Sequence, residues 1–274
     1  MLLRGQGTDL ELGITGGTTV YVGDLSGSLS QYAPQDLGWT GGIFLRSMFN
    51  RHLGVRFGLQ YARIQADELN RRVPNPRSLN FNNDLKQAFL LGEWRIINFA
   101  VAEEKILFSP FIAAGGNFQL SDPRYRDLTY GNIRLRALGT QGQGIAGYPD
   151  IYPSFVFSVP VGMGLSVMWK RRLTLTAELI GNRVFSDFID DVSDAPVLFN
   201  DLLANPLGPI NAYNHRAFIS NPILYPNASA TPYTRGGPAV DWYYWIQFTM
   251  SYRIRDSGSS RVGGRRGTSC PTFW

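Results

Sequence analysis

Cysteine and histidine are almost absent from this chain of 274 residues, which contains one cysteine and two histidines. The single cysteine, Cys270, excludes an internal disulfide framework and any metal site built from several cysteines. Long apolar runs are absent too, since no stretch approaches the roughly 18 apolar residues that a membrane-spanning helix needs. Charged residues make up only 17% of the chain, whereas Phe, Tyr and Trp make up 13%. This combination indicates a folded surface that is not wholly in contact with water.

The net charge of +5 is spread along the whole chain. Arg and Lys do not gather on a basic helix or interleave with aromatic residues as in recognition motifs, so we expect no nucleic acid as a partner. No apolar segment of a secretory signal follows Met1. If the chain is exported, we therefore expect this sequence to be a mature or truncated form.

The connections between predicted strands alternate between short and long. Strands are expected at 9–23, 39–49, 53–66, 84–99, 108–120, 153–169, 173–186 and 241–254. The short connections lie near 50–52, 99–107 and 170–172, and the long ones at 24–37, 67–83, 120–152 and 187–240. Transmembrane barrels have short periplasmic turns and long outer loops, whereas a soluble sandwich has no reason for this asymmetry. The spacing predicts an all-β fold: residues 1–254 form an eight-stranded antiparallel transmembrane β-barrel in the cell outer membrane, with both ends in the periplasm.

Side chains alternate between two faces along most of these segments, as they do in a strand. One face of the last segment is entirely apolar or aromatic, with residues Trp242, Tyr244, Ile246, Phe248, Met250, Tyr252 and Ile254. Aromatic residues at both its ends resemble the girdles of a membrane barrel, so we expect these faces to contact outer-membrane lipid. Pro160 has no N–H for the strand ladder and predicts a bulge in the sixth segment.

The opposite faces are polar and bring acids and arginines together. Their charged members are Glu11, Glu93, Glu178, Arg46, Arg56, Arg95 and Arg253. An eight-stranded barrel has room only for its own side chains or one small ligand. We therefore predict a balanced ion network that fills the interior, and we do not expect a channel. A soluble, lipocalin-like binding protein is an alternative, but it requires the aliphatic faces of the third, sixth, seventh and eighth segments to point inward.

Candidate catalytic residues are few. His215 lies in the longest loop near Asp201 and Ser220. These residues suggest an alternative function, a small outer-membrane barrel enzyme that acts on lipid as a hydrolase or acyltransferase. No serine lies in a Gly-x-Ser-x-Gly elbow, however. We therefore predict that the protein is not an enzyme and assign no catalytic residue.

Four acidic residues gather where the seventh segment ends: Asp187, Asp190, Asp191 and Asp194. Carboxylates are suitable ligands for Ca²⁺, but the spacing is not that of an EF-hand loop. We interpret the cluster as a solvated strand end whose carboxylates cap a turn. No metal ion or cofactor is expected.

Residues 255–274 are basic and rich in Gly and Ser, and we predict that they form a periplasmic tail. Such a composition is typical of a flexible segment. The tail also contains residues suited to docking, namely Arg261, Arg265, Arg266, Cys270, Phe273 and Trp274. A lone cysteine in an oxidising compartment suggests an intermolecular partner. A disordered basic tail and a partner-binding tail with Cys270 in a disulfide are both open hypotheses.

Several short patches resemble a known family. They are Glu11-Leu12-Gly13 with Tyr21-Val22-Gly23-Asp24-Leu25, then Phe108-Ser109-Pro110-Phe111 with Gly115-Gly116, then Phe185-Ser186-Asp187-Phe188-Ile189-Asp190-Asp191-Val192-Ser193, and Cys270-Pro271 near the end. Together they are similar to PorG-like proteins, small outer-membrane barrels of the Bacteroidota type IX secretion system. The patch at 185–193 is the most specific of them.

The resemblance implies a non-enzymatic component of a secretion or gliding machine. It implies a periplasmic ring as partner, built from a lipoprotein and its companion, PorK and PorN. It also implies structural roles for the motif residues Tyr21, Gly23, Asp24, Asp187, Asp190 and Asp191. The loops 120–152 and 187–240 are longer than the family pattern, which suggests contacts with other outer-membrane subunits as well.

Overall fold

Eight long strands form one closed sheet. The computed structural model describes residues 8–26, 34–71, 77–101, 106–170, 172–208, 214–237 and 240–255. The strands are β1 (Asp9–Val22), β2 (Gly38–Met48), β3 (Leu53–Asp67), β4 (Asn80–Arg95), β6 (Ile106–Leu120), β9 (Phe155–Trp169), β10 (Leu173–Val184) and β13 (Trp242–Arg255). Each is antiparallel to its neighbours, and β1 pairs with β13 to close the barrel. The predicted eight-stranded antiparallel barrel is confirmed.

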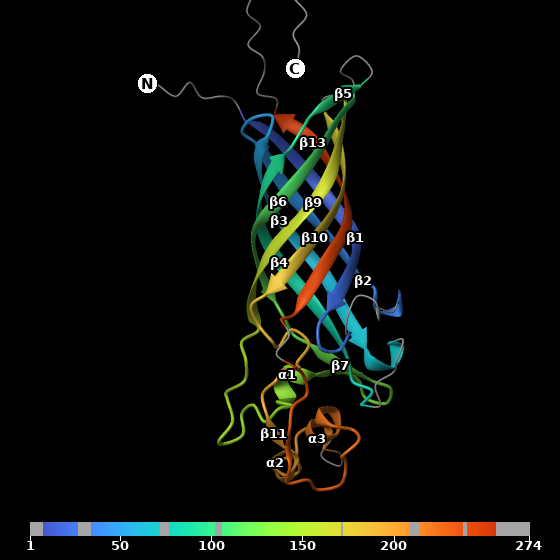
Figure 1. The fold of residues 1–274 in the computed structure, drawn as a ribbon, viewed down its shortest axis with the longest axis vertical. Helices are drawn as coiled ribbons and strands as arrows, with labels where there is room; N and C mark the ends of the chain where they lie inside the picture. The colour runs from blue at the N-terminus through green and yellow to red at the C-terminus, as the bar shows by residue number, and fades with distance from the viewer. Residues whose placement is uncertain are drawn as a thin grey trace, which may run out of the picture.

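The two ends of the barrel are built differently (Figure 1). The short connections, the start of β1 and the end of β13 lie at one end, together with the short strand β5 (Phe99–Val101). The other end carries the long loops and the small elements η2 (Pro34–Asp36), η3 (Glu68–Asn70), β7 (Arg124–Asp127), β8 (Gly131–Arg134), α1 (Leu135–Leu138), β11 (Val197–Leu198), α2 (Phe199–Ala204), α3 (His215–Ser220) and β12 (Pro232–Tyr233). We call the part of the connections β6–β9 and β10–β13 that folds beyond the barrel the outer cap. None of the described helices is long and apolar enough to cross a membrane.

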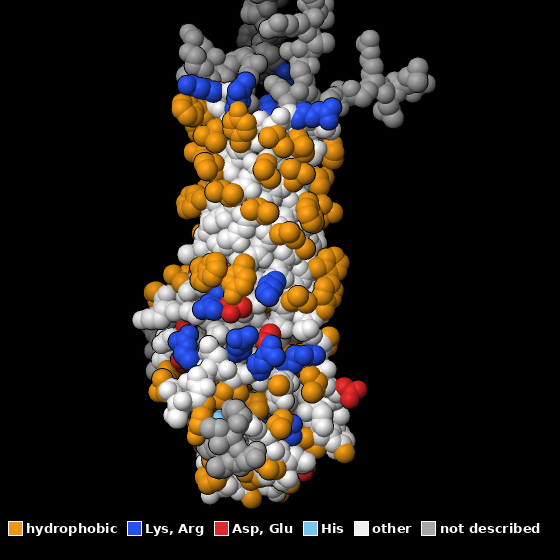
Figure 2. Space-filling model, turned by 180° about the vertical axis from the view of Figure 1, so that it is seen from behind, with side chains coloured by type: hydrophobic (Ala, Val, Ile, Leu, Met, Phe, Trp, Pro, Cys, Tyr) orange, Lys and Arg blue, Asp and Glu red, His pale blue; other side chains and the backbone are white. Residues whose placement is uncertain are grey.

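Apolar side chains cover the outside of the barrel wall. Figure 2 shows them over the cylinder, between bands of Lys and Arg at either end. Leu59 on β3, Met163 on β9 and Phe248 on β13 are 51%, 64% and 71% exposed. Soluble monomers rarely expose an apolar surface of this extent, whereas a membrane barrel carries such a belt. The lipocalin-like alternative is wrong, because it required these faces to point inward.

Charged side chains fill the barrel interior near its short-turn end. Arg46 contacts Glu11 at 3.2 Å and Glu93 at 3.0 Å, and both partners are fully buried. Arg56 contacts Glu93 and Glu178, each at 2.8 Å. We call these five residues the ion network. The guanidinium groups of Arg46 and Arg56 also lie over the ring of Phe44, at 5.1 and 5.4 Å from its centroid.

The other predicted interior charges lie beside the ion network. Arg253 contacts Glu11 at 3.7 Å and Asp9 at 3.2 Å, and Arg95 is 4% exposed. A second polar layer lies nearer the outer cap, where the Tyr243 hydroxyl contacts Gln87 and Asn117 at 2.7 and 2.8 Å. The interior therefore holds side chains, as expected for a barrel of this size.

Two local features differ from the sequence-based expectations. β4 begins at Asn80 and ends at Arg95; of the residues predicted to end it, 96–98 lie outside any strand and Phe99 begins the separate β5. No register shift occurs at Pro160: Val161 pairs with Ala114 and Ser158 with Asn117, which is one continuous register. Only the pairs between them are missing, because proline has no N–H to donate to the ladder. The predicted bulge is therefore wrong.

Candidate functional site: the outer mouth of the barrel

Two carboxyl groups share one tyrosine at the end of the barrel that carries the long loops. Tyr21 lies near the end of β1, Asp190 follows β10, and Asp241 directly precedes β13. The Tyr21 hydroxyl is 2.6 Å from Asp190 Oδ2 and 2.7 Å from Asp241 Oδ1. A phenol has one proton to donate, so it cannot donate to both carboxylates. The arrangement is therefore most favourable when one of the two carboxyl groups keeps its own proton and donates it to the phenol oxygen.

Burial favours the protonated form of both carboxyl groups. Asp190 is 1% exposed and Asp241 2%. Burial raises the pKa of Asp190 to about 8, and the nearby Asp24 adds to that shift, while the hydrogen bond from Tyr21 opposes it. Burial, followed by the proximity of Asp190, holds the pKa of Asp241 well above its usual range. Partial burial also raises the pKa of Asp187, to about 6, and the negative charge of Asp24 adds to this shift.

Asp191 ties the two loops of the outer cap together. It is fully buried and accepts hydrogen bonds from the hydroxyls of Tyr152, at 2.6 Å, and Thr140. Arg235 donates to its Oδ2 at 2.9 Å and to its carbonyl oxygen at 2.6 Å. Burial raises the pKa of this carboxyl, and Arg235 opposes the shift. Asp191 also has φ 65°, a left-handed conformation that aspartate tolerates better than most residues.

The interpretation of the acidic cluster as a solvated strand end is therefore wrong for Asp190 and Asp191, the two central residues. Asp190 and Asp191 are buried because the connection from β10 to β13 folds back over the mouth and brings Arg235 onto Asp191. Asp187 is half-buried. Among the residues that the structure describes, no three His, Cys, Asp or Glu side chains are arranged to hold a metal ion.

The structure brings the motif residues of the first and seventh predicted strands together. A Cβ atom at Gly23 would lie about 2 Å from the Tyr21 hydroxyl and from Asp241 Oδ1, so any larger residue would displace this pair. Asp24 Oδ1 accepts a hydrogen bond from the Gly237 amide at 3.2 Å. The six motif residues thus occupy one buried or half-buried site, which we call the mouth cluster: Tyr21, Gly23, Asp24, Asp187, Asp190 and Asp191. Its hydrogen bonds hold the connection between β10 and β13 against the end of β1.

The residues of the imagined hydrolytic triad have separate partners. Asp201 accepts a hydrogen bond from Tyr148 at 2.7 Å, and the Ser220 hydroxyl lies 2.5 Å from that of Tyr233. His215 is fully buried and its ring meets Tyr130 edge-on. Ser220 and His215 are five residues apart on α3, so they project about 140° apart around the helix axis. α2 and α3 also lie at the tip of the cap, away from the barrel wall (Figure 1). No catalytic arrangement follows from these contacts.

Sequence reasoning missed Arg235, Asp241, Thr140 and Tyr152 as members of this site. They lie in or beside long loops whose composition has no strand or helix period, and Arg235 is 44 residues from Asp191. The positions of Asp241, immediately before a strand, and of Asp190, soon after one, were the only available signals. The predicted partner-binding residues Arg261, Arg265, Arg266, Cys270, Phe273 and Trp274 lie outside the described residues.

The model of a domain of unknown function, DUF6089, matches residues 3–137, just under half of the chain, from before β1 to α1. No curated protein matches the sequence. Among solved structures, the chain is similar to Ail, the attachment invasion locus protein of Yersinia pestis, in complex with the heparin analogue sucrose octasulfate. Identity is 10%, 90% of this chain and 97% of that one are covered, and the TM-score is 0.36.

Two other solved structures are similar to the same extent. The N-terminal β-barrel domain of Pseudomonas aeruginosa OprF has 10% identity, with 92% and 100% of the two chains covered and a TM-score of 0.35. Neisserial surface protein A has 12% identity, with 90% and 99% covered and a TM-score of 0.36.

Proposed function

We propose that the protein is a non-enzymatic, non-conducting anchor in the outer membrane. The observation that carries this proposal is the combination of an apolar outer wall with an interior closed by the ion network. The wall fits lipid, and the paired charges inside occupy the space through which ions would pass. Because the triad candidates have separate partners, no described residue supports an enzyme.

The partner that we propose is a periplasmic protein ring. β13 ends at Arg255 at the short-turn end, and residues 256–274 follow it in the sequence. The basic and aromatic composition of that segment suits docking to another protein. By their resemblance to PorG-like proteins, the motifs at 11–25 and 185–193 support a role in the type IX secretion or gliding machinery, with a PorK- and PorN-like ring as the partner.

Co-purification tests this role. An affinity tag inserted after Asn227, in an exposed stretch of the outer cap, leaves both chain ends free. From outer membranes solubilised in mild detergent, we expect the full chain to retain the ring lipoprotein. A chain that ends at Arg255 is expected to lose it. Cys270→Ser is expected to abolish only a reducible band on non-reducing gels.

The truncated chain needs a folding control, because the last residues of a barrel can affect its assembly. Its mobility on gels before and after heating shows whether the barrel is folded. Recovery of the full chain from the outer membrane with no ring component would overturn the secretion role. An unchanged band pattern for Cys270→Ser would remove the disulfide alone.

A further inference from the structure

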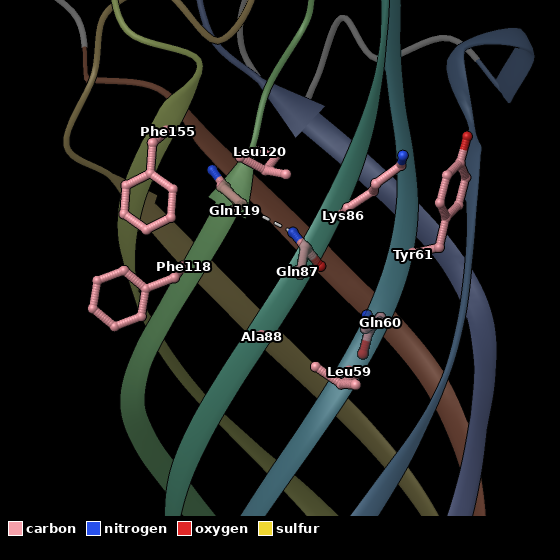
Figure 3. Close-up of a pocket in the computed structure, with 10 residues that line it drawn as sticks. All are labelled: Leu59, Gln60, Tyr61, Lys86, Gln87, Ala88, Phe118, Gln119, Leu120 and Phe155. Atoms are coloured by element: carbon pink, nitrogen blue, oxygen red, sulfur yellow. Dashed lines mark hydrogen bonds between the residues drawn. The ribbon is translucent and has the colours of Figure 1, made fainter.

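A shallow groove of about 530 Å³ runs along β4 on the outward face of the barrel (Figure 3). Its floor is Ala88, whose partners across the sheet are Leu59 on β3 and Phe118 on β6. Both partners are large and about half exposed. A small residue between two large ones leaves a trough, and Leu120 and Phe155 extend its wall on one side.

A lysine lies at the outer end of this groove. Lys86 is two residues before Ala88 on the same face of β4, and its cross-strand partners are Tyr61 and Leu120. Its side chain is exposed and forms no ion pair with the part of the chain that the structure describes. The neighbouring Arg63 differs, since it is paired with Asp84 at 2.6 and 2.9 Å. Lys86 is thus a cation set among apolar and aromatic side chains.

The height of Lys86 on the wall places it near a membrane surface. Trp94 is on the same face of β4, eight residues further along and close to the short-turn end. At about 3.3 Å per residue and a tilt of about 40°, the two positions are about 20 Å apart along the barrel axis. That is close to the roughly 25 Å height of an apolar band, so Trp94 and Lys86 lie near its two edges. Trp39 stacks on Tyr61 beside Lys86, with ring centroids 4.9 Å apart, as in an interfacial girdle.

We propose that the groove holds one acyl chain of an anionic, phosphate-bearing lipid from the leaflet at the outer-cap end, with the lipid phosphate on the Lys86 ammonium. An extended chain fits an open apolar trough, and its headgroup then meets the cation at the rim. Charge complementarity selects a phosphate-bearing lipid without a compensating positive charge. The proposal rests on the membrane location but not on the secretion role.

Native mass spectrometry of the detergent-purified protein tests this site, with phosphatidylglycerol and phosphatidylcholine as probes. The wild type is expected to bind the first phosphatidylglycerol about fivefold more tightly than phosphatidylcholine, because one basic residue near a membrane surface contributes about 1 kcal/mol. Lys86→Gln is expected to remove that preference and leave phosphatidylcholine binding unchanged. Ala88→Phe, which fills the trough, is expected to weaken the binding of both lipids.

Matched controls exist on the same barrel. Ala177 on β10 also lies between two exposed large residues, Leu165 and Phe248, but the outward residues before and after it on its strand are leucines. Ala177→Phe should therefore leave both affinities unchanged. Lys170, whose ammonium lies 4.6 Å from the Trp169 ring centroid at the short-turn end, provides the matched Lys170→Gln control.

Three results would overturn the lipid site. One is phosphatidylglycerol preference that survives Lys86→Gln, and another is Ala88→Phe binding both lipids as the wild type does. The third is a wild-type dimer that becomes a monomer in Ala88→Phe, because the groove would then be an interface between two copies of the chain. Gel mobility before and after heating verifies that each variant is folded. None of these readouts involves a ring component, so they are independent of the secretion role.

Discussion

Replacing Arg56 with leucine is expected to lower the free energy of unfolding of the barrel by about 3–5 kcal/mol. Arg56 is 1% exposed and donates two hydrogen bonds to Glu178, at 2.9 and 2.8 Å, besides contacting Glu93. Leucine would leave both carboxylates buried with part of their charge unpaired. Breaking a buried pair costs more than the pair itself contributes, because the remaining charge has been removed from water. Urea unfolding in lipid vesicles, followed by tryptophan fluorescence, measures the loss.

Arg63→Leu is the matched control for this substitution. The Arg63–Asp84 pair has comparable distances, but its side chains are 40% and 25% exposed, so the expected loss is below about 1 kcal/mol. The double variant Arg56→Leu with Glu178→Leu removes one of the stranded carboxylates and should recover part of the stability. A loss for Arg56→Leu no larger than that for Arg63→Leu would contradict the buried ion network.

Raising the pH through about 8 is expected to loosen the outer cap while the barrel stays folded. The pKa of Asp190 rises from 3.8 to about 8 in the folded protein, so the folded state holds a proton that the unfolded loop has already lost. The stability from this group is full below pH 3.8 and is lost as the pH rises to about 8. Above that pH, Asp190 is charged beside the phenol that Asp241 also contacts, with Asp24 nearby and Arg235 as the cation acting on Asp190.

Limited proteolysis at pH 6 and pH 9, read by mass spectrometry, measures this loosening. Cleavage within 186–240 should be faster at pH 9 for the wild type. In Asp190→Asn the amide cannot ionise and can donate to the phenol oxygen, so the Tyr21 proton is available to Asp241. This variant should therefore show little difference between the two pH values. Equal cleavage of the wild type at both pH values, or an unchanged pH response in Asp190→Asn, would refute the shared-proton geometry.

The barrel and its ion network could be predicted because strand side chains have a period of two. Glu11, Arg46 and Glu178 each fall on the polar face of an alternating segment, and that face points inward in all three cases. Once a sheet with an apolar exterior closes, its polar residues have only one another as partners. The alternation of apolar and polar residues therefore predicts both the barrel and its ion network.

The mouth cluster could be predicted only as a set of motif residues. Asp190 and Asp191 look solvated in the sequence because they follow a strand and begin a long loop. Their burial depends on Arg235 and Asp241, which the chain brings back from the far end of that loop. Such contacts leave no periodic pattern. The same reason explains the wrong grouping of His215, Asp201 and Ser220, which are near in sequence but paired elsewhere.

The claim that this barrel is an anchor and not a pore is tested most directly by its electrical conductance. Purified protein inserted into a planar lipid bilayer should give no discrete current steps, because the ion network occupies the interior. A porin measured in the same bilayer verifies the sensitivity of the recording. Reproducible single-channel steps from the folded wild type would contradict the account and turn the buried arginines and glutamates into the lining of an ion path.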